Sequence, residues 1–142
     1  MDYSRRELCI LLPALMAFKA QPSAKGALPS KAYPFASLTA QADGPNVFRS
    51  VFDGATHDGF HVALHATDLA PGSMPHPPHH HVHEEIFLIQ QGTLQVTIAG
   101  RDSTLGPGGV AYIRSGDEHG IRNNGTTHAH YFVFELGSDE ST

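Results

Sequence analysis

Residues 72–92 have the sequence Gly-Ser-Met-Pro-His-Pro-Pro-His-His-His-Val-His-Glu-Glu-Ile-Phe-Leu-Ile-Gln-Gln-Gly, and the rest of the chain is best understood from this stretch. Histidines crowd its first half, and an apolar run that ends near a glycine fills its second half. Side chains in an extended strand alternate between two faces, so residues of equal parity point the same way. Four potential metal donors then share one face: His79, His81, His83 and Glu85. Imidazole and carboxylate donors suit transition metals, so the stretch predicts half of a metal site.

A second pattern lies downstream, in Gly108, Gly116, His119 and Asn123. The spacing of the two patterns resembles the cupin family. The first cupin motif contains a glycine, His-x-His, a glutamate after three intervening residues and a closing glycine, and these places are occupied by Gly72, His79, His81, Glu85 and Gly92. The second motif contains a glycine, Pro-x-Gly, a histidine and an asparagine, which the downstream pattern matches except that Arg114 replaces the proline. The likeness covers about residues 45–137.

The resemblance implies an all-β fold, the double-stranded β-helix or jelly-roll barrel of a small single-domain cupin. Carried over residue by residue, it implies the metal ligands His79, His81, Glu85 and His119. The alternation of side chains along a strand independently places the first three on one face. The assignment of His119 as a ligand depends on the resemblance. Gly109 stands where the family commonly has an acidic residue. Arg114 gives up the stiffness of proline and adds a planar cation, which is either a carboxylate-binding group or an ordinary solvated arginine.

Composition limits the class of protein. At 142 residues the chain is long enough for one domain with a real core. Five of its nine basic residues lie in the first 31 residues. The rest of the chain contains four arginines and twelve acidic residues, so it is clearly acidic. Without a basic stripe to neutralise phosphates, nucleic acid is not an expected partner. The single cysteine, Cys9, cannot form an internal disulfide.

Residues 1–31 are predicted to be an export signal and the start of a linker. Arg5-Arg6 precedes an apolar run, residues 8–18, that is too short for a stable membrane span. The beginning resembles a twin-arginine signal peptide, with Leu8 where phenylalanine is usual, and the small residues around Ala24 suit a cleavage region. This interpretation implies a periplasmic or secreted protein. The alternative is a basic amphipathic tail on a cytoplasmic protein.

The remaining chain predicts a linker (32–45), a barrel (46–137) and a polar tail (138–142) with no helix after residue 31. The expected strands cover residues 47–52, 60–67, 79–89, 93–99, 103–105, 110–113, 119–123 and 128–136. Turns are expected at Asp53-Gly54 and, as a hairpin, at Asn124-Gly125. In residues 60–67 the even positions form a strongly apolar face, so His61 and His65 are expected on an ordinary polar face, as are His128 and His130 later. A homodimer is expected, with 47–52 as a shared edge.

Three imidazoles and a carboxylate would leave one or two positions open on a five- or six-coordinate ion. The donor set suits Mn, Fe, Ni or Zn, and the absence of thiolates disfavours a structural zinc site. We therefore expect a metal-dependent oxygenase or isomerase acting on a sugar, an organic acid or an aromatic compound. The alternative is a non-catalytic cupin that binds or senses a sugar or organic acid. An unstructured metal-scavenging histidine tract explains Glu85 and His119 less well. Tyr112, Glu118 and His83 are unranked candidates for proton transfer, and Asn123 is expected to stabilise a turn.

Overall fold

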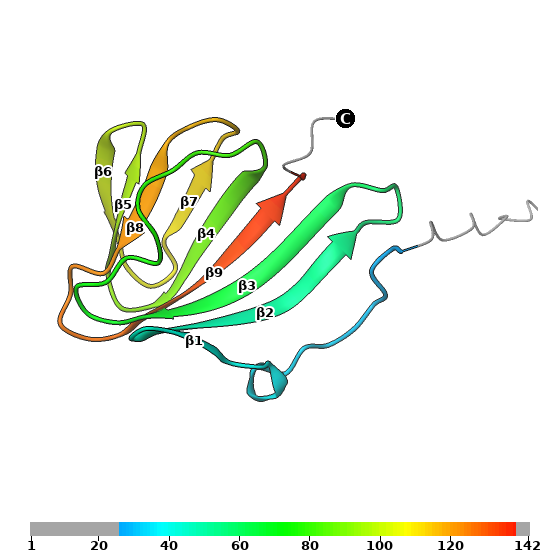
Figure 1. The fold of residues 1–142 in the computed structure, drawn as a ribbon, viewed down its shortest axis with the longest axis horizontal. Helices are drawn as coiled ribbons and strands as arrows, with labels where there is room; N and C mark the ends of the chain where they lie inside the picture. The colour runs from blue at the N-terminus through cyan, green and yellow to red at the C-terminus, as the bar shows by residue number, and fades with distance from the viewer. Residues whose placement is uncertain (1–25, 139–142) are drawn as a thin grey trace, which may run out of the picture.

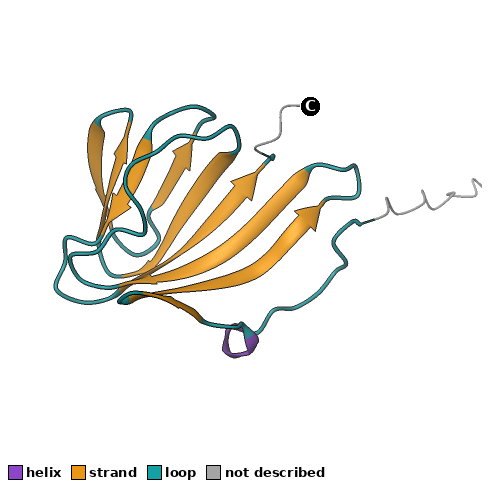
Figure 2. Ribbon diagram, viewed as in Figure 1, coloured by secondary structure: helices purple, strands orange, loops and turns teal. Residues whose placement is uncertain are grey.

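The computed structural model describes residues 26–138, which form one curved all-β barrel (Figure 1 and Figure 2). Within this part of the chain there is one short 3-10 helix, η1 (Phe35–Ser37), and nine strands. The strands are β1 (Gln41–Asp43), β2 (Asn46–Ala55), β3 (His61–Leu69), β4 (Glu84–Gln91), β5 (Leu94–Ile98), β6 (Arg101–Leu105), β7 (Val110–Ile113), β8 (His119–Arg122) and β9 (Ala129–Leu136). No helix among the described residues is long and apolar enough to cross a membrane.

Two antiparallel sheets make up the barrel. The larger has the order β1-β2-β3-β9-β4-β7 and the smaller the order β6-β5-β8. The core lies between them and includes Leu69, Ile89, Leu94, Ile113 and Tyr131, which are at most 2% exposed. Apolar residues that alternate along short strands separated by turns favour this two-layer solution, since each sheet buries one face against the other. The predicted all-β jelly-roll fold is confirmed.

The more apolar face of β3 is not the one that points into the barrel. Its odd-numbered residues face the interior: Ala63, Thr67 and Leu69 are buried, and they pair directly with interior residues of β9. Phe60, expected to begin the apolar face, is 52% exposed. The interior of this barrel contains a polar cavity, so the strand face with more apolar residues is not the one that points inward.

The even-numbered residues of β3 belong instead to an apolar surface on the outside of the larger sheet. Leu64 pairs with Phe134, Phe134 with Ile86, and Ile86 with Tyr112, so these four side chains form one row across four strands. Tyr112 is 54% exposed, and its neighbour Val110 on the same face of β7 is 55% exposed. We call the row, together with Phe132, Leu88 and Val110, the outer apolar face.

The beginning of the described chain is attached to β2. Ala27 forms a parallel bridge with Ala55, and the Leu28 N–H donates to the Ala55 carbonyl at 2.8 Å. The Leu28 side chain packs over Gly54, where an added Cβ would lie 2.9 Å from Leu28 Cδ2. The range expected to be linker also contains η1 and β1, and β1 pairs with the start of β2 at residues 46–48. The edge of β2 expected to be shared with a second subunit is therefore partly covered by the chain itself.

Two expected turns differ from the structure. Asp53-Gly54 lies inside β2, and the turn to β3 follows at Thr56, whose N–H donates to the Phe60 carbonyl at 2.7 Å. Asn124-Gly125 does not close a hairpin, because β8 pairs with β5 in the smaller sheet whereas β9 pairs with β3 and β4 in the larger one. The loop after Arg122 is thus a crossover between the two sheets.

Candidate metal centre

The loop between β3 and β4, residues 70–83, carries two of the predicted ligands alongside the edge of β8. His79 and His119 form an isolated antiparallel bridge, with N–H to O distances of 3.0 and 2.8 Å. The Gly116 N–H donates to the His81 carbonyl at 2.9 Å. Strand β4 begins only at Glu84, so the expected strand over 79–89 is wrong in its first five residues. Backbone bonds to the segment around β8 hold the histidines where a continuous strand was expected to hold them.

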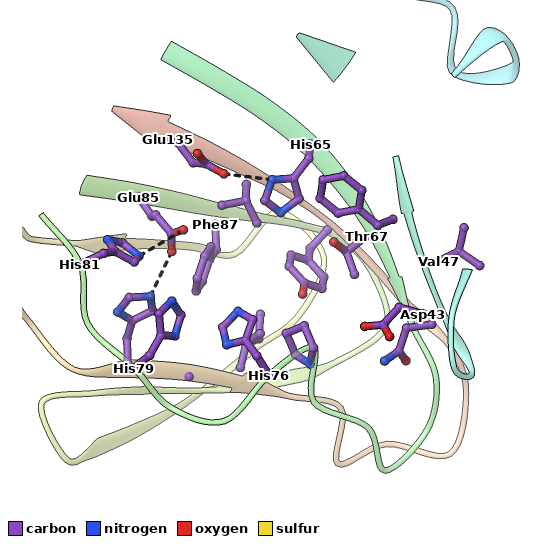
Figure 3. Close-up of a pocket in the computed structure, with 18 of the residues that line it drawn as sticks. Asp43, Val47, His65, Thr67, His76, His79, His81, Glu85, Phe87 and Glu135 are labelled. Carbon is purple, nitrogen blue, oxygen red and sulfur yellow. Dashed lines mark ion pairs between the residues drawn. The ribbon is translucent and has the colours of Figure 1, made fainter. Parts of the chain in front are cut away.

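The four predicted ligands lie in one connected cluster in the cavity wall. His119 Nε2 lies 3.1 Å from Glu85 Oε2, and His81 Nε2 lies 3.4 Å from Glu85 Oε1. The His79 ring centre is 4.8 Å from that of His119 and 5.1 Å from that of His81. Donor atoms of His79, His81 and His119 all lie within 4.8 Å of one another, as do those of His81, His83 and Glu85. Figure 3 shows His79, His81 and Glu85 turned toward one another from the loop and β4.

Three imidazole nitrogens at this point make no well-aligned hydrogen bond, although two of them, His81 Nε2 and His119 Nε2, lie 3.4 and 3.1 Å from oxygens of Glu85. They are His79 Nδ1, His81 Nε2 and His119 Nε2, all buried in the part of the chain that the structure describes. In two of these rings the other nitrogen contacts a backbone carbonyl: His81 Nδ1 lies 2.8 Å from the His83 oxygen and His119 Nδ1 lies 2.9 Å from the Asp117 oxygen. Such a contact fixes the Nδ1–H tautomer and leaves an Nε2 lone pair aimed inward, as in metal-binding histidines.

Charges in the cluster are arranged around Glu85. Burial raises the pKa of Glu85, but hydrogen bonding to His119 and the potential of His81 outweigh it and hold the pKa below its usual value. Burial lowers the pKa of His119, yet the hydrogen bond to Glu85 and the Asp117 carbonyl raise it above its usual value overall. Burial lowers the pKa of His79, and the neighbouring histidines lower it further. The lowered pKa values of Glu85 and His79 favour the protonation states that metal binding needs, whereas the raised pKa of His119 favours a proton that an incoming ion would have to displace.

His83 is a possible further donor or a support for the ligands. Its ring stacks on His81 with centres 3.5 Å apart and 8° between planes, and its Nε2 lies 3.4 Å from Glu85 Oε1. His80 is exposed, as its parity predicts. Arg114 is largely exposed and pairs with Asp117 at 3.2 Å, which agrees with the interpretation as a solvated loop arginine. Tyr112 and Glu118 are both exposed and do not line the cavity, which removes them as candidates for proton transfer at this centre.

Next to the cluster, a cavity of about 480 Å³ extends between the two sheets (Figure 3). The sequence did not assign His65 and Glu135 to this cavity. His65 Nδ1 lies 3.4 Å from Glu135 Oε1, and both residues line the wall. The expectation that His65 occupies an ordinary polar face is wrong, because that face of β3 is the inner one. His65 lies on the same strand face as Thr67 and Leu69, which are both buried. This shared face is the pattern in the sequence that could have assigned His65 to the interior. His61 and His128 instead pair with Asp53 and Asp68, and neither lines the cavity.

Part of this barrel matches the model of a known protein family. The family description "Cupin domain" matches residues 66–135, which contain all four predicted ligands. This stretch is thus similar to the cupin domain. No curated protein matches the chain in sequence.

Solved cupin-like structures share the barrel at low sequence identity. An RmlC-like cupin from Shewanella frigidimarina is 16% identical, with a TM-score of 0.64 over 78% of this chain and 95% of that one. A predicted oxalate decarboxylase from Thermotoga maritima is 19% identical, with a TM-score of 0.66 over 76% of this chain and all (100%) of that one. The polyketide cyclase RemF from Streptomyces resistomycificus is 20% identical, with a TM-score of 0.65 over 80% and 83% of the two chains. At these identities the likeness shows the fold, and the chemistry must come from this chain's own residues.

Proposed function

We propose that this cupin-like domain binds a divalent metal ion through His79, His81, Glu85 and His119 and is a small metal-dependent enzyme, an oxygenase or isomerase of a small molecule. One observation carries the proposal: three buried imidazole nitrogens, none with a well-aligned hydrogen bond, lie beside the carboxylate of Glu85. Buried polar atoms are costly unless they are satisfied, and an ion satisfies all three at once. The set contains no thiolate, which favours Mn, Fe, Ni or Zn in an open site over a closed structural zinc site.

The cavity supports small-molecule chemistry at the centre. An ion held there would act as a Lewis acid with coordination positions left for a ligand oxygen. The chain's own contribution is to orient that ligand with the apolar wall, to exclude water with the loop at 70–83, and to accept or hold a proton at Glu85, Glu135 or His83. A cavity of about 480 Å³ has the size of an ordinary small-molecule site.

The test is metal analysis of protein purified without a histidine tag. We expect about one ion per chain in the wild type and in His80→Ala, since the His80 side chain is exposed. His119→Ala and Glu85→Gln should lose most of the metal. Equal metal content in all four proteins would refute the site. Oxygen uptake and substrate turnover then separate an enzyme from a binding module, for which ligands would raise the melting temperature without turnover.

We also propose export through the twin-arginine pathway to the periplasm. The predicted signal lies outside the described residues, and the support is the order of arginine pair, apolar run and small residues. Expressed in a bacterium with that pathway, the wild type should appear shortened in the periplasmic fraction, whereas a variant with lysine at positions 5 and 6 should stay in the cytoplasm. An uncut wild type distributed like the variant would contradict export and favour a basic membrane-surface tail.

A further inference from the structure

The cavity wall beyond the metal centre is aromatic. Phe87 on β4 lies with its ring centre 6.1 Å from that of His119 and 6.2 Å from that of Tyr131 on β9. On the neighbouring strands, Phe48 packs on His65 with ring centres 4.7 Å apart. Val133 and Ile121 complete this part of the wall. A flat ligand that places one oxygen at the metal centre would therefore lie against aromatic rings, which favour stacked or edge-on contacts.

Apart from the histidines, the ionisable side chains that line the cavity wall are acidic or phenolic. Among the described residues that line the cavity there is no lysine or arginine, and the acidic ones are Asp43, Glu85 and Glu135. Figure 3 shows Asp43 at the end of the cavity away from the histidine cluster, and Glu135 beside His65 on the wall that also carries Glu85. An anionic tail placed away from the metal centre would lose hydration without gaining a permanent cation from the wall, since the positive charge of the proposed ion would be met by the hydroxyl oxygen at the other end of the ligand.

Glu135 is the acidic group placed to meet the ligand beyond the metal. It pairs directly with Glu85 across β9 and β4, so both carboxylates project into the same space. Its side chain is 28% exposed, and His65 holds Oε1 at 3.4 Å. The hydrogen bond with His65 keeps the pKa of Glu135 below its usual value, so the group carries a negative charge at neutral pH. His65 is itself fixed by Phe48, which orients the pair.

We propose that the Glu135–His65 pair selects the ligand by charge, so that the cavity takes an aromatic hydroxyl compound with a neutral or cationic tail and rejects the same compound with a carboxylate tail. This inference rests on the proposed metal centre, which binds the hydroxyl oxygen. It narrows the substrate class from sugars, organic acids and aromatics to phenol-like molecules without a negative tail. The negative charge of Glu85 would be neutralised by the bound metal. The negative charges of Glu135 and Asp43 would instead act on the ligand in the cavity.

Three phenols of similar size provide the test: 4-ethylphenol, tyramine and 3-(4-hydroxyphenyl)propionate. Their binding is measured by calorimetry on full-length protein loaded with Zn²⁺, a metal without redox chemistry that would turn the probes over. We expect tyramine and 4-ethylphenol to bind at least about tenfold more tightly than the propionate at low salt, where charge effects are least screened. Glu135→Gln should reduce this ratio to about threefold or less by raising the affinity for the propionate. Glu118→Gln, an exposed carboxylate outside the cavity, should leave the ratio unchanged.

Binding of the propionate as tight as that of tyramine would overturn the inference, as would a wild-type ratio that Glu135→Gln does not change. Absence of binding by all three phenols would overturn it too. Metal content is measured on the same samples. A protein that holds its zinc but shows no charge preference refutes only the ligand class, whereas a protein without zinc refutes the metal centre and this inference with it.

Discussion

The side chain of Asn123 provides the sharpest test of how the loops around the metal centre are held. It is fully buried, at 0% exposure, in the crossover from β8 to β9. Its Nδ2 donates to the Leu69 carbonyl at 2.9 Å and to the Thr127 carbonyl at 2.8 Å, and its Oδ1 accepts from the Gly125 N–H at 2.9 Å. One amide thus joins the end of β3 to both sides of the crossover loop.

Asn123→Ala removes all three bonds. A net contribution of about 1 kcal/mol for each gives a predicted loss of about 3 kcal/mol in the free energy of unfolding. For a domain of this size, that corresponds to a melting temperature lower by roughly 10 °C. Asn123→Asp should be at least as harmful, because it keeps the bond to Gly125 but turns a carboxylate oxygen toward two carbonyl oxygens.

Urea unfolding followed by circular dichroism measures the change, and Asn124→Ala is the matched control. Asn124 is exposed and bonds to Gln95 at the surface, so its loss should cost less than about 0.5 kcal/mol. A destabilisation below about 1 kcal/mol in Asn123→Ala would refute the assignment of Asn123 as the amide that ties these loops together. Metal content per folded molecule should stay near the wild-type level, since Asn123 is not one of the proposed ligands.

Three further predictions follow from contacts away from the centre. Hydrogen bonds to the Gly137 carbonyl and Asp53 raise the pKa of His61 in the folded protein. The stabilisation from protonated His61 is therefore complete below about pH 6.5 and is lost as the pH rises through the folded-state pKa. The free energy of unfolding should fall more between pH 6 and pH 8 in the wild type than in His61→Gln. A chain that starts at residue 26 should melt like the full-length protein, whereas one that starts at residue 31 should lose about 1–2 kcal/mol in chemical unfolding, because the backbone bond and packing of Leu28 on β2 are gone. Light scattering at micromolar concentration should show a homodimer that meets through the outer apolar face, with Tyr112→Glu monomeric; a monomeric wild type would contradict this arrangement.

The site was more predictable from the sequence than the strands that surround it. Parity grouped His79, His81 and Glu85 and excluded His80, although residues 79–83 are not part of a strand. The loop is locally extended at His79, where it bridges His119, and this is enough to preserve the alternation. The spacing of the two motifs located His119, which no periodicity would have connected with residues forty positions earlier.

The missed features share one physical cause. Periodicity identifies which residues share a face of a strand, but the direction of that face depends on what lies on either side. The odd face of β3 contains His65 and Thr67 and is inward because the barrel encloses a polar cavity, while Leu64 is on the outside. The same limit applies to Asn124-Gly125, since a turn dipeptide does not determine whether the next strand joins the same sheet.

The loop at residues 70–83 has a consequence for how an ion would exchange with the surroundings. Glu85 belongs to the larger sheet and His119 to the smaller one, and the loop that supplies His79 and His81 is bonded across to His119 and Gly116. An ion bound to all four residues would tie the loop to both sheets, so local unfolding of the loop, which removes two of its ligands, would speed the release of the ion. Slow exchange from the folded loop would make the resident metal a record of the ions available while the barrel was folding. Isotope exchange with labelled zinc, compared with the rate of amide hydrogen exchange in the loop, would measure this coupling directly.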